Sequence, residues 1–228
     1  MKKILAIASN ANPELKGKKT GLWLSELTHF LDEIIEAGYE YDIASPNGGE
    51  ISLDENSITT KQLADPSNVK LMANARFKSL LKNSLKVLEA NVAEYDAIYL
   101  SGGHGTMFDF RQSTNLQTII TKFHSQGKIL SGVCHGVAGF IDSIDSTGAK
   151  IVRNKRVTGF SNLEDIILGT HSLMPFLLET ELKNNGALYK KNFFPFTKRV
   201  EIDGKLITGQ NPQSAKAVGS AVVKTLSI

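Results

Sequence analysis

A chain of 228 residues with 41% hydrophobic and 21% charged side chains has the composition of an ordinary globular protein of one or at most two domains, which excludes collagen-like, coiled-coil and wholly disordered proteins. The net charge is only +3, and the densest basic groups (Lys16, Lys18 and Lys19; Lys190 and Lys191) have no interleaved aromatic residues, so we interpret both as solvated loops and expect no nucleic-acid partner. The one cysteine, Cys134, excludes an intramolecular disulfide and favours a reducing, cytoplasmic compartment.

The N-terminal segment predicts a βαβ unit. The apolar run Lys2–Ala8 is too short for a membrane span or a good signal peptide, and we interpret it as a buried parallel strand. Apolar residues then recur at helical spacing over Gly21–Ala37, Gly38 ends the predicted helix, and Tyr39–Ala44 is a second strand. Such a unit implies a parallel sheet with a right-handed crossover.

Residues 45–92 interrupt this alternation. They open with the turn Pro46–Gly49, stay polar as far as Asp65–Ser67, and show helical patterns from about Val69 to Leu88. Because the segment is short and poor in strand pattern, we interpret it as a small helical insertion that covers one end of the sheet, not as a second domain.

Strands and helices alternate again after residue 92. We expect strands at Ala97–Leu100, Lys128–Val133 and Leu206–Thr208, a hairpin arm at Ile151–Thr158, and helices at Leu116–Gln126, Val137–Ile144, Met174–Asn184 and Ser214–Leu226. The sequence therefore predicts a single α/β domain over residues 1–228. Its doubly wound, mostly parallel sheet has helices on both faces and binds ligands at the carboxyl ends of the strands.

Cys134 is the strongest candidate for a nucleophile. It lies in the segment Ser131–Gly136, between a predicted buried strand and a helix, with small residues on both sides, which is the pattern of a nucleophile elbow. Unpaired amide groups at a helix N-terminus lower the pKa of a thiol, so we expect a reactive thiolate here. The alternative is an inert buried cysteine.

Three acidic residues are candidates to work with this thiol. His135 follows Cys134 and needs a carboxylate that fixes its tautomer, for which Glu164 and Asp165 are both candidates. Glu26 has apolar neighbours at helical spacing, so its carboxyl group is expected to be desolvated and to remain protonated. Alternatively, Glu164 and Asp165 are ordinary acidic residues in the first turn of a helix, and Glu26 is a glutamate at the boundary between core and solvent.

The glycine-rich run Ser101–Gly105 follows a predicted strand. Its spacing matches neither a dinucleotide-binding motif nor a P-loop, so nucleotide binding is not expected. We predict instead an oxyanion or substrate-binding site built from Gly102, Gly103 and His104, with Gly136 beside the cysteine. The scattered histidines and the lone cysteine predict no metal site.

These segments together resemble the PfpI-type, class I glutamine-amidotransferase-like superfamily, and within it the branch of glutathione-independent glyoxalases (glyoxalase III, also called D-lactate dehydratase) and heat-inducible chaperones. The resemblance spans essentially the whole chain in order. The matching segments are Thr20–Glu26, Ala44–Gly49, Asp65–Ser67, Ser101–Gly105, Gly132–Gly136, Thr158–Asn162, Pro175–Glu179 and Thr208–Pro212.

The resemblance implies a flavodoxin-like fold with catalytic Cys134, His135 beside it and Glu26 touching the sulfur. It also implies an acidic residue soon after Gly159–Phe160, for which Asp165 is preferred over Glu164. The implied activity is the conversion of 2-oxoaldehydes such as methylglyoxal to 2-hydroxy acids such as D-lactate, through a cysteine hemithioacetal. The resemblance implies that the protein needs no cofactor and that it forms a homodimer. Repair of glycated protein would use the same residues.

Other functions remain as alternatives. A stress-induced holdase chaperone would bind unfolded protein clients, and a redox-sensing protein would keep only vestigial catalysis. A glutamine amidotransferase domain is disfavoured because the histidine follows the cysteine directly, instead of lying far downstream. A cysteine peptidase is disfavoured because the chain leaves little room for a peptide cleft.

Overall fold

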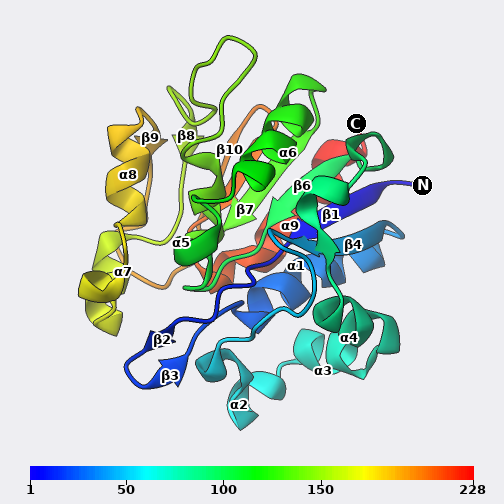
Figure 1. Ribbon diagram of the computed structural model, residues 1–228, viewed down its shortest axis with the longest axis vertical. Coiled ribbons are helices and arrows are strands. Elements are labelled where there is room, and N and C mark those ends of the chain that lie inside the picture. Colours follow the sequence, from blue (N-terminus) through cyan, green and yellow to red (C-terminus); the bar gives the residue numbers. More distant parts are fainter.

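One seven-stranded sheet organises residues 1–228, all of which are described by a computed structural model (Figure 1). Its strands are β1 (Lys3–Ile7), β4 (Glu40–Ser45), β5 (Leu85–Lys86), β6 (Ala97–Leu100), β7 (Ile129–Val133), β10 (Val200–Asp203) and β11 (Leu206–Gly209). They lie in the order β10-β11-β7-β6-β1-β4-β5, and every neighbouring pair is parallel except β10 with β11. The carboxyl ends of the parallel strands therefore meet at one edge, where ligands bind in such folds.

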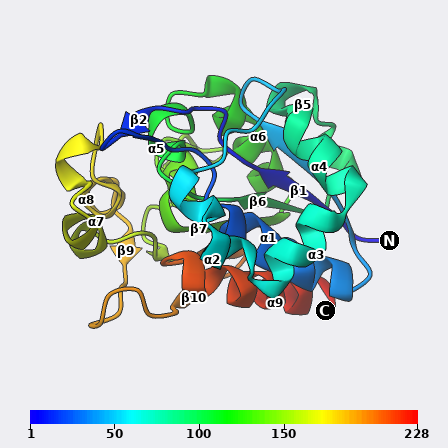
Figure 2. The same ribbon diagram turned by 90° about the horizontal axis from the view of Figure 1, so that it is seen from below.

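Helices cover both faces of this sheet. They are α1 (Leu24–Glu36), α2 (Thr60–Leu63), α3 (Pro66–Ala73), α4 (Ala75–Lys82), α5 (Thr106–Asp109), α6 (Thr114–Ser125), α7 (Asn162–Leu168), α8 (Leu178–Asn184) and α9 (Ala215–Leu226). Helices α1, α3 and α9 pack together on one side, and α6 packs on β6 and β7 on the other (Figure 2). None of the helices has the length and apolar character that a membrane crossing requires.

The α/β class predicted from the sequence is confirmed, and several elements differ in detail. Residues 45–92 hold α3 and α4 where helical patterns were expected, but they also contain α2, which was not predicted, and β5, which extends the sheet beyond β4. The expected hairpin arm Ile151–Thr158 is wrong: only β8 (Arg156–Val157) forms there, and it pairs in parallel with β9 (Leu188–Tyr189). Strand β10, which the sequence did not suggest, forms the hairpin with β11 instead.

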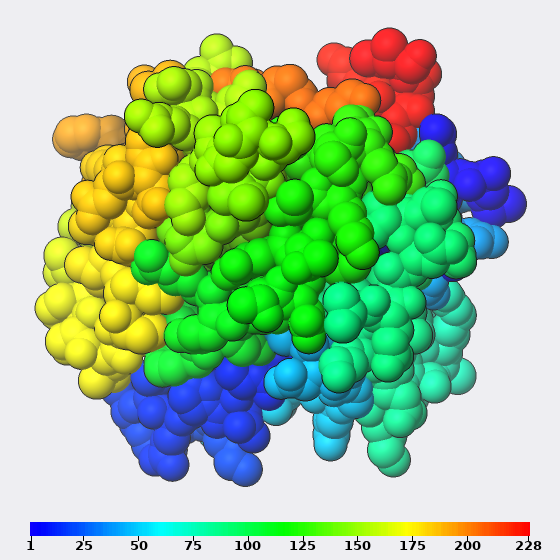
Figure 3. All heavy atoms as spheres, turned by 45° about the horizontal axis from the view of Figure 1, so that its top comes forward, coloured from blue at the N-terminus to red at the C-terminus, as the bar shows by residue number.

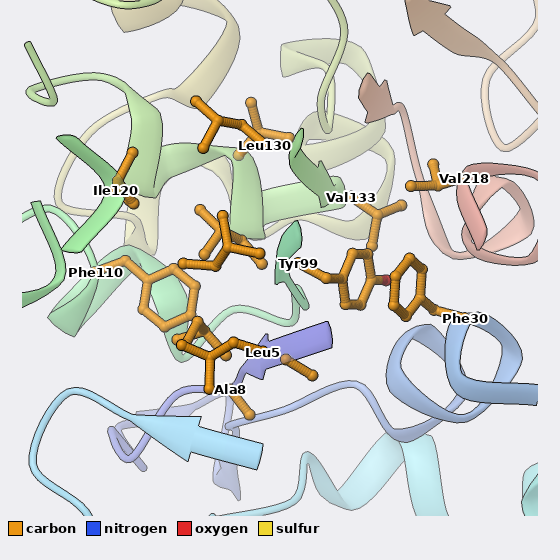
Figure 4. Close-up of a cluster of buried hydrophobic side chains, with 14 of the residues drawn as sticks. Leu5, Ala8, Phe30, Tyr99, Phe110, Ile120, Leu130, Val133 and Val218 are labelled. Carbon is orange, nitrogen blue, oxygen red and sulfur yellow. The ribbon is translucent and has the colours of Figure 1, made fainter. Parts of the chain in front are cut away.

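The hydrophobic core reaches the site through one aromatic pair. Phe30 of α1 stacks on Tyr99 of β6 with ring centroids 3.6 Å apart and planes nearly parallel (Figure 4). The Tyr99 hydroxyl donates a hydrogen bond of 2.7 Å to the carbonyl of Glu26, one helical turn before Phe30. The buried stack therefore fixes the position of Glu26 relative to the end of β6.

Candidate active site

Cys134 lies on a sharp turn at the carboxyl end of β7. Its backbone has φ = 54°, an uncommon conformation for a residue with a side chain. A 3₁₀ helix, Cys134–Phe140, starts at the cysteine itself, whereas the sequence predicted a short helix at Val137–Ile144. The turn directs a 97% buried thiol toward the end of the sheet, the geometry expected of a nucleophile elbow.

His135 and Asp165 form a relay beside the thiol. The Cys134 Sγ lies 3.6 Å from His135 Nδ1, and His135 Nε2 lies 3.2 Å from Asp165 Oδ2. Burial lowers the pKa of His135 although Asp165 opposes it, which favours the neutral imidazole. Burial alone would raise the pKa of Asp165, but His135 and His104 hold it well below its usual range. A neutral imidazole thus faces the cysteine, and an ionised carboxylate lies on the far side of that imidazole.

The second oxygen of Asp165 faces another histidine. His104 Nε2 lies 3.5 Å from Asp165 Oδ1, and the rings of His104 and His135 are 4.6 Å apart. These two imidazoles and the carboxylate place one ligand atom each within 4.8 Å of one another, so they could hold a metal ion. Contact of both imidazoles with one shared carboxylate accounts for the same arrangement, although His104 Nε2 makes no hydrogen bond.

Glu26 approaches the thiol from α1. Its carboxyl group is 99% buried, and Oε2 accepts a 2.9 Å hydrogen bond from the Gly102 amide. Burial raises the pKa of Glu26 to about 8, although a hydrogen bond with Cys134 opposes the rise. Glu26 is therefore mostly protonated at neutral pH, as its place on the apolar stripe of the helix predicted.

The expected depression of the Cys134 pKa is not what the environment produces. Burial, and then the negative charge of Glu26, raise the pKa of Cys134, while the amide of His135 lowers it. The charge repulsion disappears when Glu26 carries the proton, so the ionisation of each group depends on the state of the other. A thiolate at Cys134 is therefore less unfavourable while Glu26 is neutral.

Glu164 does not contact His135. It forms a capping box with Ser161 at the start of α7, where Oε2 accepts the Ser161 amide at 2.9 Å and hydroxyl at 2.8 Å. Its other oxygen accepts from the Phe196 amide at 2.8 Å, Gln210 Nε2 at 3.1 Å and Asn211 Nδ2 at 2.9 Å. The structure thus places Asp165 against the imidazole and Glu164 in a structural network.

The four residues expected at an oxyanion site have different surroundings. The Gly102 amide is occupied by Glu26, and the glycine is needed because a Cβ would lie 2.4 Å from Glu26 Oε2. Gly136 lets the 3₁₀ helix approach β6, since its Cβ would lie 2.5 Å from the Leu100 carbonyl oxygen. Gly103, at φ = 105°, and His104 line the cavity. The candidate oxyanion donors are therefore the amides near Gly103 and His135.

The thiol opens into a cavity of about 170 Å³. Its wall includes aromatic residues that the sequence analysis did not select. The ring centroid of Phe160 lies 4.5 Å from that of His135, with the two rings tilted. The ring centroid of Phe196 lies 6.2 Å from that of Phe160. The wall is completed by Trp23, Leu168, Pro212 and Gln213. Trp23, Phe160 and Pro212 lay in segments that resembled the family, whereas Phe196 carries no local signal.

Comparison with known proteins places this geometry in a family context. A model of the DJ-1/PfpI family matches residues 20–225. The chain is 32% identical to Glyoxalase 3 of Candida albicans over 98% of this chain and 97% of the relative. It is 30% identical to the glutathione-independent glyoxalase HSP31 of Saccharomyces cerevisiae, over 99% of this chain and 98% of the relative.

Solved structures agree with the sequence comparisons. Rapid Encystment Protein 24 kDa of Francisella tularensis superposes with a TM-score of 0.93 at 40% identity over 99% of both chains. Glyoxalase III of Candida albicans superposes with a TM-score of 0.91 at 31% identity, over 98% of this chain and 96% of that one. The similarity therefore extends over the whole fold, including the segments that form the site.

Proposed function

We propose that this chain, which belongs to the DJ-1/PfpI family, is a glutathione-independent glyoxalase that converts 2-oxoaldehydes such as methylglyoxal to 2-hydroxy acids such as D-lactate. One observation carries the proposal: a buried cysteine shares a small cavity with a protonated glutamate and a histidine–aspartate pair. A cavity of about 170 Å³ suits a small substrate. The names of full-length relatives support the same activity.

The first step is addition of the Cys134 thiolate to the aldehyde carbon. Glu26, protonated because its pKa is near 8, gives its proton to the aldehyde oxygen, so a neutral hemithioacetal forms. The amides near Gly103 and His135 stabilise the negative charge that develops on this oxygen. Glu26 is then an ionised base next to the C1 hydrogen.

The second step is an internal proton shift. Glu26 removes the C1 hydrogen to give an enediol and returns a proton to C2, while His135 moves the hydroxyl proton from the C1 oxygen to the C2 oxygen. The product is a thioester of a 2-hydroxy acid. Water cleaves it to the acid and restores one proton to the Cys134–Glu26 pair. The net reaction adds one water, and neither an external oxidant nor a cofactor is needed.

Methylglyoxal loss in the absence of glutathione, measured for the wild type and for Cys134→Ser, tests the proposal. A hydroxyl group near its free pKa cannot replace the thiolate, so turnover should fall by at least about a hundredfold while the circular dichroism spectrum is unchanged. Retention of more than a few per cent of the rate would refute the covalent mechanism. Holdase activity, if present, should survive the substitution because it does not require the thiol.

We further propose a homodimer and a cytoplasmic compartment. Exposed apolar side chains support an interface with a second copy, above all Phe193 and Phe194, whose exposed fractions are 88% and 69%. A single unpaired cysteine supports a reducing compartment. Light scattering at several concentrations tests the first proposal, since a dimer has twice the monomer mass of 24.9 kDa. Unfolded or glycated protein clients remain proposals that a client-aggregation assay would test.

A further inference from the structure

A second cavity adjoins the catalytic one. It has a volume of about 350 Å³, and it shares Trp23, His104 and Leu168 with the cavity that contains Cys134. The two spaces are therefore neighbours that have these three side chains in common. We call the second cavity the vestibule, and its remaining wall consists of Leu15, Lys16, Lys18, Lys19, Thr20, Asp54, Asn56 and Thr170.

The vestibule brings together segments that are far apart in the sequence. Strands β2 (Glu14–Leu15) and β3 (Lys18–Lys19) form a short hairpin that carries the three lysines. Lys16 occupies its turn with φ = 53° and donates a 2.7 Å hydrogen bond to the carbonyl of Leu168 at the end of α7. Figure 3 shows the N-terminal region, in blue, against the yellow region that contains α7. The hairpin is thus attached beside the catalytic site.

The lysines of the vestibule lack acidic partners. Lys16 and Lys18 donate to neutral acceptors, the Leu168 carbonyl and, at 2.9 Å, Asn56 Oδ1, and no carboxylate lies within 4.0 Å of any of the three ammonium groups. Lys150 and Lys191, by contrast, lie 2.8 Å and 3.0 Å from carboxylates. The hairpin therefore holds three positive charges without neutralising them.

The acidic residues nearby offset only part of this charge. Asp54 lines the vestibule, but it is 98% buried and accepts hydrogen bonds from the Thr20 hydroxyl and, at 2.8 Å, the Asn56 amide. Glu14 is opposite Lys19 in the hairpin, yet the two side chains form no ion pair. The vestibule thus presents an excess of positive charge next to a reactive thiol.

We propose that the vestibule binds an anionic group of the substrate, so that the enzyme accepts 2-oxoaldehydes bearing a carboxylate or a phosphate several atoms from the reacting carbonyl. The inference rests on the proposed function and adds a substrate class to it. A molecule as small as methylglyoxal occupies only the catalytic cavity and leaves the lysines unused. A longer substrate would place its carbonyl at Cys134 and its anion between Lys18 and Lys19.

A matched pair of substrates tests this inference. Phenylglyoxal and 4-carboxyphenylglyoxal have the same reacting group and differ by one carboxylate. We expect kcat/KM to favour the anionic substrate in the wild type, and the preference to fall by about three- to tenfold in the double variant Lys18→Gln, Lys19→Gln or in high salt. Activity toward methylglyoxal should be unchanged. Lys16 is left intact because it attaches the hairpin to α7.

The control is Lys122→Gln with Lys224→Gln, which removes the same charge from two exposed positions on α6 and α9 that line neither cavity. This variant should keep the preference for the anionic substrate. The inference would be overturned if the wild type turned over both substrates with no preference for the carboxylate, or if both double variants had the same preference. Either result would leave the proposed function standing.

A binding measurement covers the case in which no 2-oxoaldehyde is consumed, which would refute the proposed function. Trp23 is the one tryptophan of the chain and lines both cavities, so its fluorescence reports occupancy. Terephthalate, a dianion, should change this fluorescence and bind about threefold or more weakly to the Lys18→Gln, Lys19→Gln variant, whereas neutral terephthalamide should bind both equally. Equal terephthalate affinities would exclude the anion site.

Discussion

At the scale of single residues, Cys134 and Glu26 have to be treated as one titrating pair. Each is buried beside the other, and the negative charge of Glu26 is second only to burial in raising the pKa of Cys134. The backbone at φ = 54° directs the sulfur toward the end of the sheet where Glu26 lies. The chemistry therefore depends on which group of the pair carries the proton.

Replacing Glu26 by glutamine separates the pair. Glu26→Gln removes the charge that opposes ionisation of the thiol, so the pKa of Cys134 should fall, yet methylglyoxal turnover should drop by about a hundredfold or more because an amide cannot exchange the C1 proton. Thiolate absorbance at 240 nm against pH measures the first effect without interference from other cysteines. A variant with a lower thiol pKa and normal kcat would mean that Glu26 only tunes the nucleophile.

Asp165 and Glu164 offer a second test, because they are adjacent in sequence and differ in what they touch. Asp165→Asn should lower kcat by about two to four orders of magnitude, since an amide favours the wrong tautomer of His135. The pH dependence of kcat should shift as well, because the charge that stabilises protonated His135 is lost. Near-normal kcat with an unchanged pH profile would show that Asp165 is not part of the relay.

These two residues also mark the limit of what the sequence reveals about the site. The turn at Cys134 with His135 beside it, and the burial of Glu26, were predictable from local patterns, whereas the contact of Glu26 with the sulfur was implied only by the family resemblance. Asp165 and Glu164 were not separable in this way, since one step along a helix turns a side chain by about 100° and only the packing of α7 decides which one faces His135. Phe196 was missed because its place in the cavity depends on a loop without regular structure.

At the scale of elements, Glu164 connects three parts of the chain. Its carboxylate joins the start of α7 to the loop at Phe196 and to the segment after β11 through Gln210 and Asn211. Because all of these donors point at one buried group, the aromatic wall of the cavity depends on it. Glu164 therefore supports the site without touching the substrate.

Glu164→Gln should accordingly destabilise the protein. The amide keeps the size of the side chain but turns one acceptor into a donor that faces other donors, a cost of about 1–3 kcal/mol in the free energy of unfolding. Urea denaturation at neutral pH measures the loss, and Glu89→Gln, at an exposed position, should change the midpoint very little. If the urea midpoint of Glu164→Gln equalled that of Glu89→Gln, the network around Glu164 would add nothing to the stability of the protein.

The elements themselves were predictable to different degrees. Helix α1 has a clear apolar periodicity and strands β1, β4, β6 and β7 have buried apolar runs, and the predicted segments overlap them closely. Strand β5 has only two residues, and β10 lies at an edge with partly exposed side chains, so neither leaves a clear pattern in the sequence. The predicted hairpin at Ile151–Thr158 failed because its apolar residues pack into the core without forming a ladder with each other.

At the scale of the whole molecule, the alternation of strands and helices was sufficient to predict the doubly wound sheet and the edge at which Cys134 and its cavity lie. The vestibule could not be predicted in the same way. It is assembled from residues 15–20, 54–56 and 168–170, and its three lysines look like an ordinary solvated loop in the sequence. Only the fold shows that this loop lies next to the catalytic cavity.

The folding stability of the whole molecule should depend on the proton that Glu26 holds. Its pKa rises from 4.5 in the unfolded chain to about 8 in the folded protein, so the folded state binds this proton more tightly and unfolding releases it. The free energy of unfolding must therefore fall as the pH rises between these two values. Glu26→Gln abolishes this contribution, and the variant should gain stability over the wild type between about pH 5 and about pH 8, by up to about 4 kcal/mol.

Urea denaturation of both proteins at the two pH values measures this difference directly. His135, whose pKa is lowered by burial, has the opposite pH dependence, but it is present in both proteins and largely cancels in the comparison. Glu89→Gln, at an exposed position, should show a stability difference from the wild type that is the same at both pH values. If the stability difference between Glu26→Gln and the wild type were also the same at both pH values, Glu26 would be ionised in the folded protein. The step in which it protonates the aldehyde oxygen would then have to be assigned to another group.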